Sequence, residues 1–216
     1  MILSRGRGYL FIHAPKTGGT SMSLALEARA MKDDIMLGDT PKARQRRKRT
    51  DGVTSAGRLW KHATLADLDG LVKEDELDAL FIFTMVRNPW DRMVSYYHWL
   101  QAQSFDHPSV ALAKRLDFET FVAQPIIAQS FTNSPATSYV TDAKGRERAD
   151  LFIRLEHLTQ DIAPLEAHLG FKLDMPHVNR STRLTDYRVS YTEESRERVA
   201  QMCAADIAQF GYRFEH

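Results

Sequence analysis

The fold is decided by residues 9–21, which read YLFIHAPKTGGTS. The first five residues form a short apolar run rich in β-formers, which predicts a buried strand. A loop containing Pro15, Gly18 and Gly19 follows, and a helix-compatible stretch begins at Thr20, with Thr20 or Ser21 as the expected cap. The stretch therefore predicts a strand, a glycine-containing loop and a helix, in that order.

This loop carries the components of a phosphate site. Gly18 and Gly19 permit a tight turn that brings amide N–H groups close to an anion, and the helix N-terminus adds donors and a favourable dipole. Lys16 supplies a full positive charge. Hydroxyl donors are present at Thr17, Thr20 and Ser21. A glycine pair alone also suits an ordinary strand-to-helix turn. In a Walker A loop the lysine follows the last glycine, so Lys16 is expected to approach a phosphate from the strand side instead.

A second strand-to-helix junction lies at residues 79–97. Residues 79–86, ALFIFTMV, are apolar on both faces, as in a central parallel strand. The following RNPWDRMVSYY starts a helix, because Asn88 suits a cap and Pro89 the first helical position. Arg87 can form a forked contact with a phosphate, and Ser95 can donate from the helix flank. Taken alone, Arg87 would also be explained by an ion pair with Asp91, and Ser95 by a hydroxyl exposed to solvent. The two residues together favour a second phosphate site.

The remaining pattern predicts the architecture. Residues 151–154 read as a third strand, and residues 38–58 and 126–150 as loop-rich. Further helices are expected at residues 64–72, from 117 to near 125, up to 169 and from 192 to 210. Strands alternating with helices predict a three-layer α/β fold with a central, mostly parallel sheet, as one domain over residues 1–216. Ligands of open α/β sheets bind at the carboxyl ends of the strands, so one ligand with two separated phosphates would use both sites.

Composition narrows the class of protein. The net charge is only +1, which argues against a polyanion binder, so no nucleic-acid partner is expected. Cys203 is the single cysteine, which excludes an internal disulfide or a cysteine-built metal site. The sequence shows no apolar run suited to a signal peptide or a membrane span. We therefore expect a soluble protein of the cytoplasm.

At the two phosphate motifs the chain resembles the sulfotransferases that use 3′-phosphoadenosine 5′-phosphosulfate (PAPS). It is most similar to the group that includes the carbohydrate O-sulfotransferases and bacterial members. Supporting similarity lies at residues 154–156, 176–181 and 206–212. The resemblance implies a P-loop-like sulfotransferase fold and transfer of a sulfuryl group to a hydroxyl or amine of a small molecule or glycan. It is weak over residues 30–58 and 101–150, where the acceptor would be selected.

The resemblance also implies roles for individual residues. The 5′-phosphosulfate would be bound by Lys16, Gly18, Gly19, Thr20 and Ser21, with Thr17 in the same loop. The 3′-phosphate would be bound by Arg87 and Ser95. Arg180 or Ser181 would close over the nucleotide. Lys16 would stabilise the leaving phosphate, so no metal is expected.

An acceptor hydroxyl benefits from a general base, and histidine suits neutral pH. His62 lies between the two motifs, where related sulfotransferases often carry their base, and is the candidate; a surface or capping histidine is the alternative. His13 and His98 are expected to be structural, and Glu156 to stabilise its loop.

Other interpretations remain open at this level. A small-molecule kinase also uses strand–loop–helix phosphate sites and would require ATP and magnesium. A non-catalytic nucleotide-binding protein would bind the bisphosphate without transfer. The basic run at residues 42–49 is typical of a solvated surface, although it would also attract an anionic acceptor.

Overall fold

The computed structural model describes residues 1–176 and 186–215. Two compact units form within them. The first unit comprises Met1–Val86 and the described part of Ala136–Val178, and it contains the sheet. The second comprises Arg87–Pro135 and the described part of Asn179–His216, and its described elements are helical. The two units are described separately.

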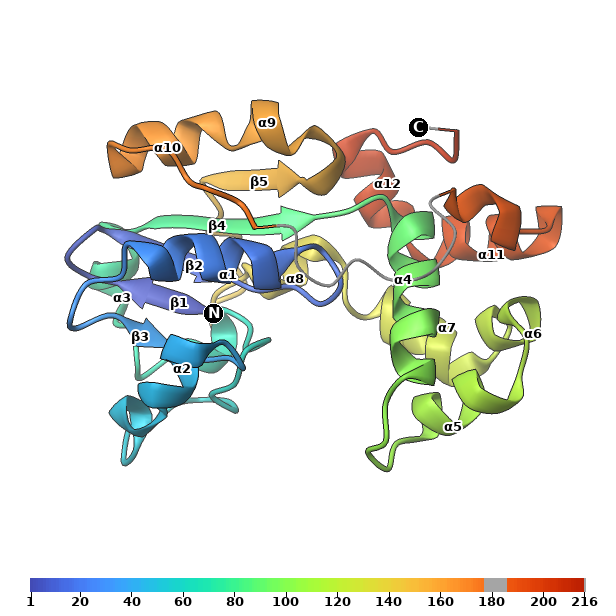
Figure 1. The fold of residues 1–216 in the computed structure, drawn as a ribbon, viewed down its shortest axis with the longest axis horizontal. Helices are drawn as coiled ribbons and strands as arrows, with labels where there is room; N and C mark the ends of the chain where they lie inside the picture. Colours follow the sequence, from blue (N-terminus) through green and yellow to red (C-terminus); the bar gives the residue numbers. More distant parts are fainter. Residues whose placement is uncertain (177–185, 216) are drawn as a thin grey trace. The chain divides into compact units, whose positions relative to one another are not determined.

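The first unit is built on a sheet of five described strands in the order β3-β1-β2-β4-β5. Their bounds are β1 (Ile2–Ser4), β2 (Tyr9–Ile12), β3 (Ile35–Met36), β4 (Phe81–Val86) and β5 (Leu151–Arg154). β2 pairs in parallel with β4, and β4 with β5, whereas β1 is antiparallel to both β2 and β3. All described strands except β1 therefore run in one direction, so the predicted, mostly parallel sheet is confirmed (Figure 1).

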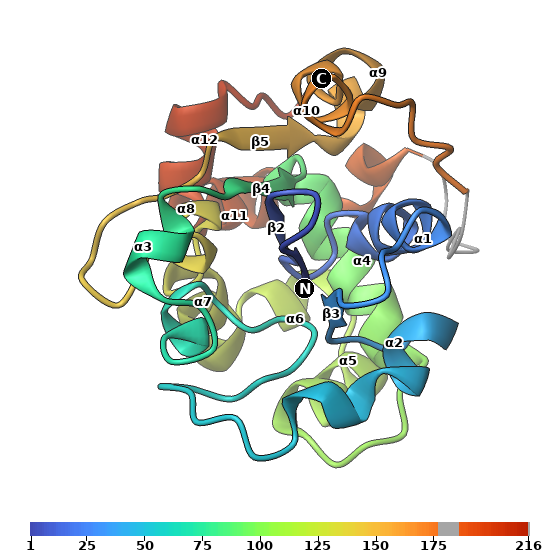
Figure 2. The ribbon, with the colours of Figure 1, turned by 90° about the vertical axis from the view of Figure 1, so that its left-hand side faces the viewer.

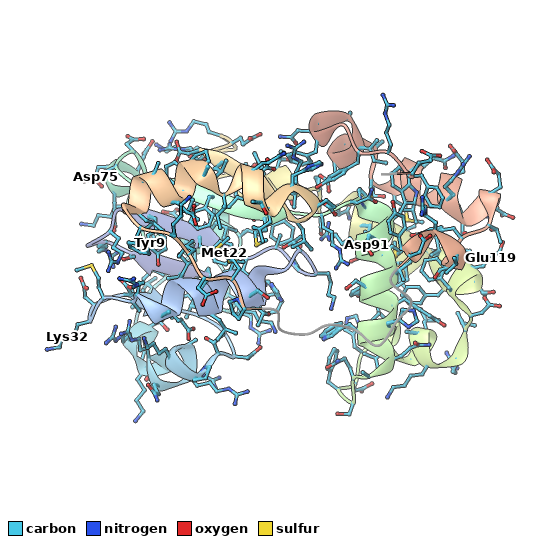
Figure 3. The ribbon with its side chains drawn as sticks, turned by 45° about the horizontal axis from the view of Figure 1, so that its top comes forward. Tyr9, Met22, Lys32, Asp75, Asp91 and Glu119 are labelled. Atoms are coloured by element: carbon cyan, nitrogen blue, oxygen red, sulfur yellow. The ribbon has the colours of Figure 1, made fainter. Side chains whose placement is uncertain are left out.

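Side chains alternate between two hydrophobic layers along each strand. Leu10, Ile12 and Ile82 face a cluster that also contains Leu65, Leu68 and Leu77. Tyr9, Phe11 and Phe83 face the opposite cluster, which contains Met22, Leu26 and Leu165. Figure 3 labels Tyr9 and Met22 within this second cluster. Figure 2 shows α1 (Gly19–Ala28) and α3 (Glu74–Leu77) on opposite sides of β2 and β4, which gives the predicted three layers.

Short elements complete the first unit: α2 (Pro41–Gln45), η1 (Arg47–Thr50), η2 (Ala66–Leu68), α8 (Ala136–Tyr139), η3 (Leu155–His157), α9 (Leu158–Asp161) and α10 (Ala163–Leu169). The predicted helix at residues 64–72 is a single turn, although the Asp67 carboxylate does accept hydrogen bonds from the Thr64 amide and hydroxyl, both at 2.8 Å. The helix predicted to end at residue 169 does so, and Gly170 follows α10 in the left-handed conformation, with φ 75°.

The second unit consists of α4 (Pro89–Gln101), α5 (Pro108–Arg115), α6 (Phe118–Val122), α7 (Pro125–Thr132), η4 (Tyr187–Ser190), α11 (Glu193–Met202) and α12 (Ala204–Phe210). Five residues of α4 recur at helical spacing and form its buried, core-facing stripe: Trp90, Met93, Val94, Tyr97 and Leu100. The Thr192 hydroxyl, at the cap of α11, donates to Glu119 of α6, which Figure 3 labels.

Two predictions of local structure were wrong. Residues 126–150 were predicted to be loop-rich, but α7 lies there: α6 ends at Val122, as expected near Pro125, and Pro125 then begins α7, because proline suits the first helical turn. The predicted helix from residue 192 to 210 is interrupted at Cys203, which ends α11 and precedes α12. Within the described residues, none of the helices is long and apolar enough to cross a membrane.

Candidate nucleotide-binding and catalytic site

The β2–α1 loop enters its helix through a glycine in the left-handed conformation. Gly18 precedes α1 in the left-handed region with φ 87°, and in the described structure no side chain caps this helix. The predicted caps Thr20 and Ser21 are therefore wrong; both lie in the first helical turn, and both are partly exposed. The first intrahelical bonds come from the Ser21 and Met22 amides to the Gly18 carbonyl. Earlier N–H groups have no partner within the helix, which is the arrangement that attracts an anion.

Lys16 also has positive φ, at 65°. A non-glycine residue in this region is uncommon and costs about 1–2 kcal/mol relative to right-handed backbone. The buried hydroxyl of Thr17 donates to the Ala14 carbonyl at 2.8 Å. The Thr17 hydroxyl therefore donates its hydrogen bond within the loop, although the sequence predicted that it would donate to a phosphate.

Close contacts fix the position of this loop. A Cβ on Gly18 would lie 2.8 Å from Leu155 Cδ1, and Leu155 directly follows β5. A Cβ on Gly19 would lie 2.1 Å from Cδ2 of the buried His13 ring, which stacks on Phe11. Gly19 is therefore required by close approach to the His13 ring and Gly18 by its positive φ, and the loop lies over the carboxyl ends of the strands, as expected.

His62 lies directly beside the start of this loop. Its Nδ1 atom is 2.7 Å from the His13 carbonyl oxygen, and the two imidazole centroids are 4.7 Å apart. A carbonyl oxygen only accepts hydrogen bonds, so Nδ1 carries the hydrogen and donates it. In the neutral ring, Nε2 then holds the free lone pair. The structure thus brings His62 to the phosphate loop, although the two are separated by more than forty residues in the sequence.

Burial keeps both imidazoles neutral. Desolvation lowers the pKa of His62 to about 4, with Lys61 adding to the effect and the hydrogen bond to the His13 carbonyl opposing it. The pKa of His13 also falls well below its ordinary value, again mainly through burial. At neutral pH, His62 is therefore uncharged, and its Nε2 lone pair carries no proton.

At the β4–α4 junction, a side chain accepts hydrogen bonds from the first backbone amides of the helix. Asn88 Oδ1 accepts from the Trp90 and Asp91 amides, at 3.1 and 3.4 Å, and Nδ2 donates to the Arg213 carbonyl. Arg87 directly continues β4 and forms an ion pair with Asp91, with Nη2 to Oδ2 at 2.6 Å. Figure 3 labels Asp91 on α4. The predicted cap at Asn88 is confirmed, and Arg87 makes the ion pair that sequence analysis named as its alternative.

The other predicted residues have different surroundings. Ser95 is buried on α4, four residues after Asp91, and therefore shares a helix face with that residue. His98 Nδ1 is 3.2 Å from Gln101 Oε1, and Glu156 is exposed in η3. Arg180 and Ser181 lie outside the described residues, so their predicted position over the nucleotide has no structural description.

Part of the basic run has a structural function. Lys42 Nζ donates to the Glu27 carbonyl in the last turn of α1, and Arg46 and Arg49 donate to the Asp34 carbonyl at 3.3 and 2.6 Å. Cations near helix C-termini and free carbonyls are stabilising. These three side chains therefore hold α2 and η1 against the segment that follows α1.

Comparison with known proteins gives the family. A family model described as the sulfotransferase family matches residues 1–213, and so spans both compact units. This chain belongs to the sulfotransferase family. Among curated proteins, none matches it. Among solved structures, this sulfotransferase is similar to mouse sulfotransferase SULT7A1 in complex with PAP, with a TM-score of 0.53 and 14% identity over 93% of this chain and 84% of the mouse chain. At that identity the similarity supports the shared fold.

The family assignment decides between the interpretations that the sequence left open. The enzyme is a sulfotransferase, so its two strand-to-helix junctions are not those of a small-molecule kinase. Sequence analysis gave no role to the His13 carbonyl or to Trp60, whose ring contacts His62. The only signal for Trp60 was a large aromatic residue two positions before the candidate base.

Proposed function

We propose that this sulfotransferase transfers the sulfuryl group of PAPS to an organic hydroxyl, with the two units acting as one catalytic domain. The observation that carries the proposal is the uncapped start of α1, preceded by Lys16 and contacted through His13 by His62. An anionic donor fits this start, because backbone N–H groups at a helix N-terminus attract an anion and Lys16 of the same loop adds a positive charge. The mouse structural relative is a complex with PAP, which fits the same donor.

In the proposed reaction the 5′-phosphosulfate lies on the N–H groups of Gly18, Gly19 and Thr20, beside the hydroxyl of Ser21. His62 Nε2 takes the proton of the acceptor hydroxyl while the acceptor oxygen bonds to sulfur. The bond between sulfur and the bridging oxygen breaks, and its electron pair stays on the 5′-phosphate, which leaves as adenosine 3′,5′-bisphosphate. Lys16 stabilises that developing charge.

The opposite end of the nucleotide is assigned to Arg87 and Ser95. Arg87 follows the carboxyl end of β4, and the Lys16 loop follows β2, the adjacent parallel strand. Ligands of such sheets bind at these ends. The ion pair with Asp91 orients the guanidinium at the end of β4. A glycan is the acceptor that the family resemblance favours.

The donor assignment is tested by calorimetric titration with adenosine 3′,5′-bisphosphate and with adenosine 5′-phosphate. Arg87→Ala should weaken the bisphosphate about 10–100-fold, because charge-assisted hydrogen bonds contribute about 1.5–3 kcal/mol, and should leave the monophosphate nearly unchanged. The control is Arg115→Ala, which removes an exposed arginine of α5. Equal losses for both nucleotides would refute the 3′-phosphate assignment. Transfer from radiolabelled PAPS should persist in EDTA.

The base is tested with His62→Asn, whose amide can still donate to the His13 carbonyl. We expect kcat to fall about 10²–10⁴-fold, as when a general base is lost, with the affinity for adenosine 3′,5′-bisphosphate preserved. His168→Asn is the matched control, because Nε2 of that histidine also contacts a backbone carbonyl, that of Arg7 at 3.0 Å. Unchanged turnover in His62→Asn would remove His62 from the mechanism.

A further inference from the structure

Trp60 places an exposed indole directly beside the candidate base. The side chain is 40% exposed, and its ring meets the His62 ring edge to face, with centroids 5.1 Å apart and planes at 87°. The guanidinium of Arg58 lies 5.2 Å from the indole centroid. A large apolar ring is thus exposed to solvent and contacts the imidazole whose Nε2 atom is the proposed proton acceptor.

The other tryptophans have different surroundings. Trp90 is buried, and its Nε1 donates to the Arg196 carbonyl at 2.9 Å, as is usual for a core indole. Trp99 is 37% exposed, and its ring contacts the rings of Tyr96 and Phe105. Trp60 and Trp99 therefore have nearly equal exposure, and the ring of Trp60 contacts a candidate catalytic group, His62.

A continuous series of contacts joins Trp60 to the phosphate loop within the first unit. The Gly19 backbone touches the His13 ring, His13 and His62 are 4.7 Å apart at their centroids, and Trp60 follows at 5.1 Å. A general base must lie within about 3 Å of the proton that it takes. An acceptor hydroxyl on His62 therefore brings the group that carries it within reach of the indole.

We propose that the exposed indole of Trp60 packs against the ring that carries the acceptor hydroxyl, so that Trp60 selects ring alcohols over open-chain alcohols. This inference rests on the proposed function, in which His62 is the base. An indole offers a large, rigid apolar surface, which suits the face of a sugar ring or a phenol. The cation–π contact with Arg58 restricts the indole and so lowers the entropy lost on binding. Sugar and phenol share the recognised feature, a hydroxyl on a ring.

The test compares kcat/KM for three probe acceptors: chitotriose, 2-naphthol and 1-butanol. In Trp60→Ala, the preference for the better ring acceptor over 1-butanol should fall about tenfold, and Trp60→Phe should recover most of it. Trp99→Ala is the matched control and should keep the preference. The ring acceptor whose kcat/KM falls more in Trp60→Ala shows whether the indole recognises a sugar or a phenol. An equal loss for ring and open-chain acceptors in Trp60→Ala would mean that Trp60 only supports His62, and would overturn the inference.

A second measurement does not require turnover. The protein has three tryptophans and therefore three indole N–H resonances, and Trp60→Phe identifies the one from Trp60. With adenosine 3′,5′-bisphosphate bound, chitotriose or 2-naphthol should shift this resonance and 1-butanol should not, in wild type and in His62→Asn alike. If neither ring compound shifts the resonance although adenosine 3′,5′-bisphosphate still binds, the inference is overturned. Loss of bisphosphate binding in the wild type would overturn the proposed function instead.

Discussion

The two strand-to-helix junctions, at residues 13–19 and 87–89, look alike in sequence but satisfy their helices differently. At the first, Gly18 turns the chain and the start of α1 keeps N–H groups without intrahelical partners. At the second, the Asn88 side chain accepts from two amides of α4. The first junction therefore offers backbone donors to an anion, whereas the second offers a side chain, Arg87. An added Cβ should therefore impair the first junction, whereas loss of the arginine charge should impair anion binding at the second.

The largest effect is expected at Lys16. Lys16→Gly should lower kcat about 10²–10³-fold, as removal of one charge-stabilising group does at other active sites. It should also leave the protein up to about 1 kcal/mol more stable than Lys16→Ala, because glycine adopts the positive φ without strain. Turnover with radiolabelled PAPS and urea unfolding measure the two effects. Full activity in Lys16→Gly would show that backbone donors alone carry catalysis.

The difference between the junctions is tested by two substitutions to alanine. Gly19→Ala should destabilise the protein by about 2–3 kcal/mol, because the new Cβ would overlap the buried His13 ring, which is stacked on Phe11. Asn88→Ala should cost about 1 kcal/mol, the usual value of a helix cap. Urea midpoints at constant slope measure both. A larger loss in Asn88→Ala than in Gly19→Ala would contradict the comparison.

The pH dependence of stability tests the environment of His62. Its pKa is about 4 in the folded protein, against the ordinary histidine value of 6.5 that we expect for the unfolded chain. Between these values the unfolded chain binds more protons, so this contribution to stability is complete above pH 6.5 and is lost as the pH falls toward 4. From about pH 7 to about pH 5 the loss should be about 2 kcal/mol. The His62→Asn variant should lack this part of the decrease; an identical pH profile would mean that His62 is not desolvated.

Much of the first unit was predictable from the sequence because its signals are local. The strands at residues 9–12, 81–86 and 151–154 are continuous apolar runs, and they form the parallel part of the sheet. β1 and β3 were missed because three- and two-residue strands show no periodicity. Pro125 was taken as a stop, although proline equally starts a helix, and only the packing that follows distinguishes the two.

The sequence by itself determined the order of strand, loop and helix, the glycines of the loop between β2 and α1, and the lysine and arginine that follow two strands. These features depend on neighbouring residues and on conformations that few residue types adopt. Only the tertiary structure decided that His62 meets the His13 carbonyl, that Thr17 closes the loop and that the Trp60 ring contacts the His62 ring. The contact between His62 and His13 joins residues 49 positions apart in the chain. The contacts of Thr17 and Trp60 are local, but they depend on how the loop and the side chains pack, which sequence preferences do not specify.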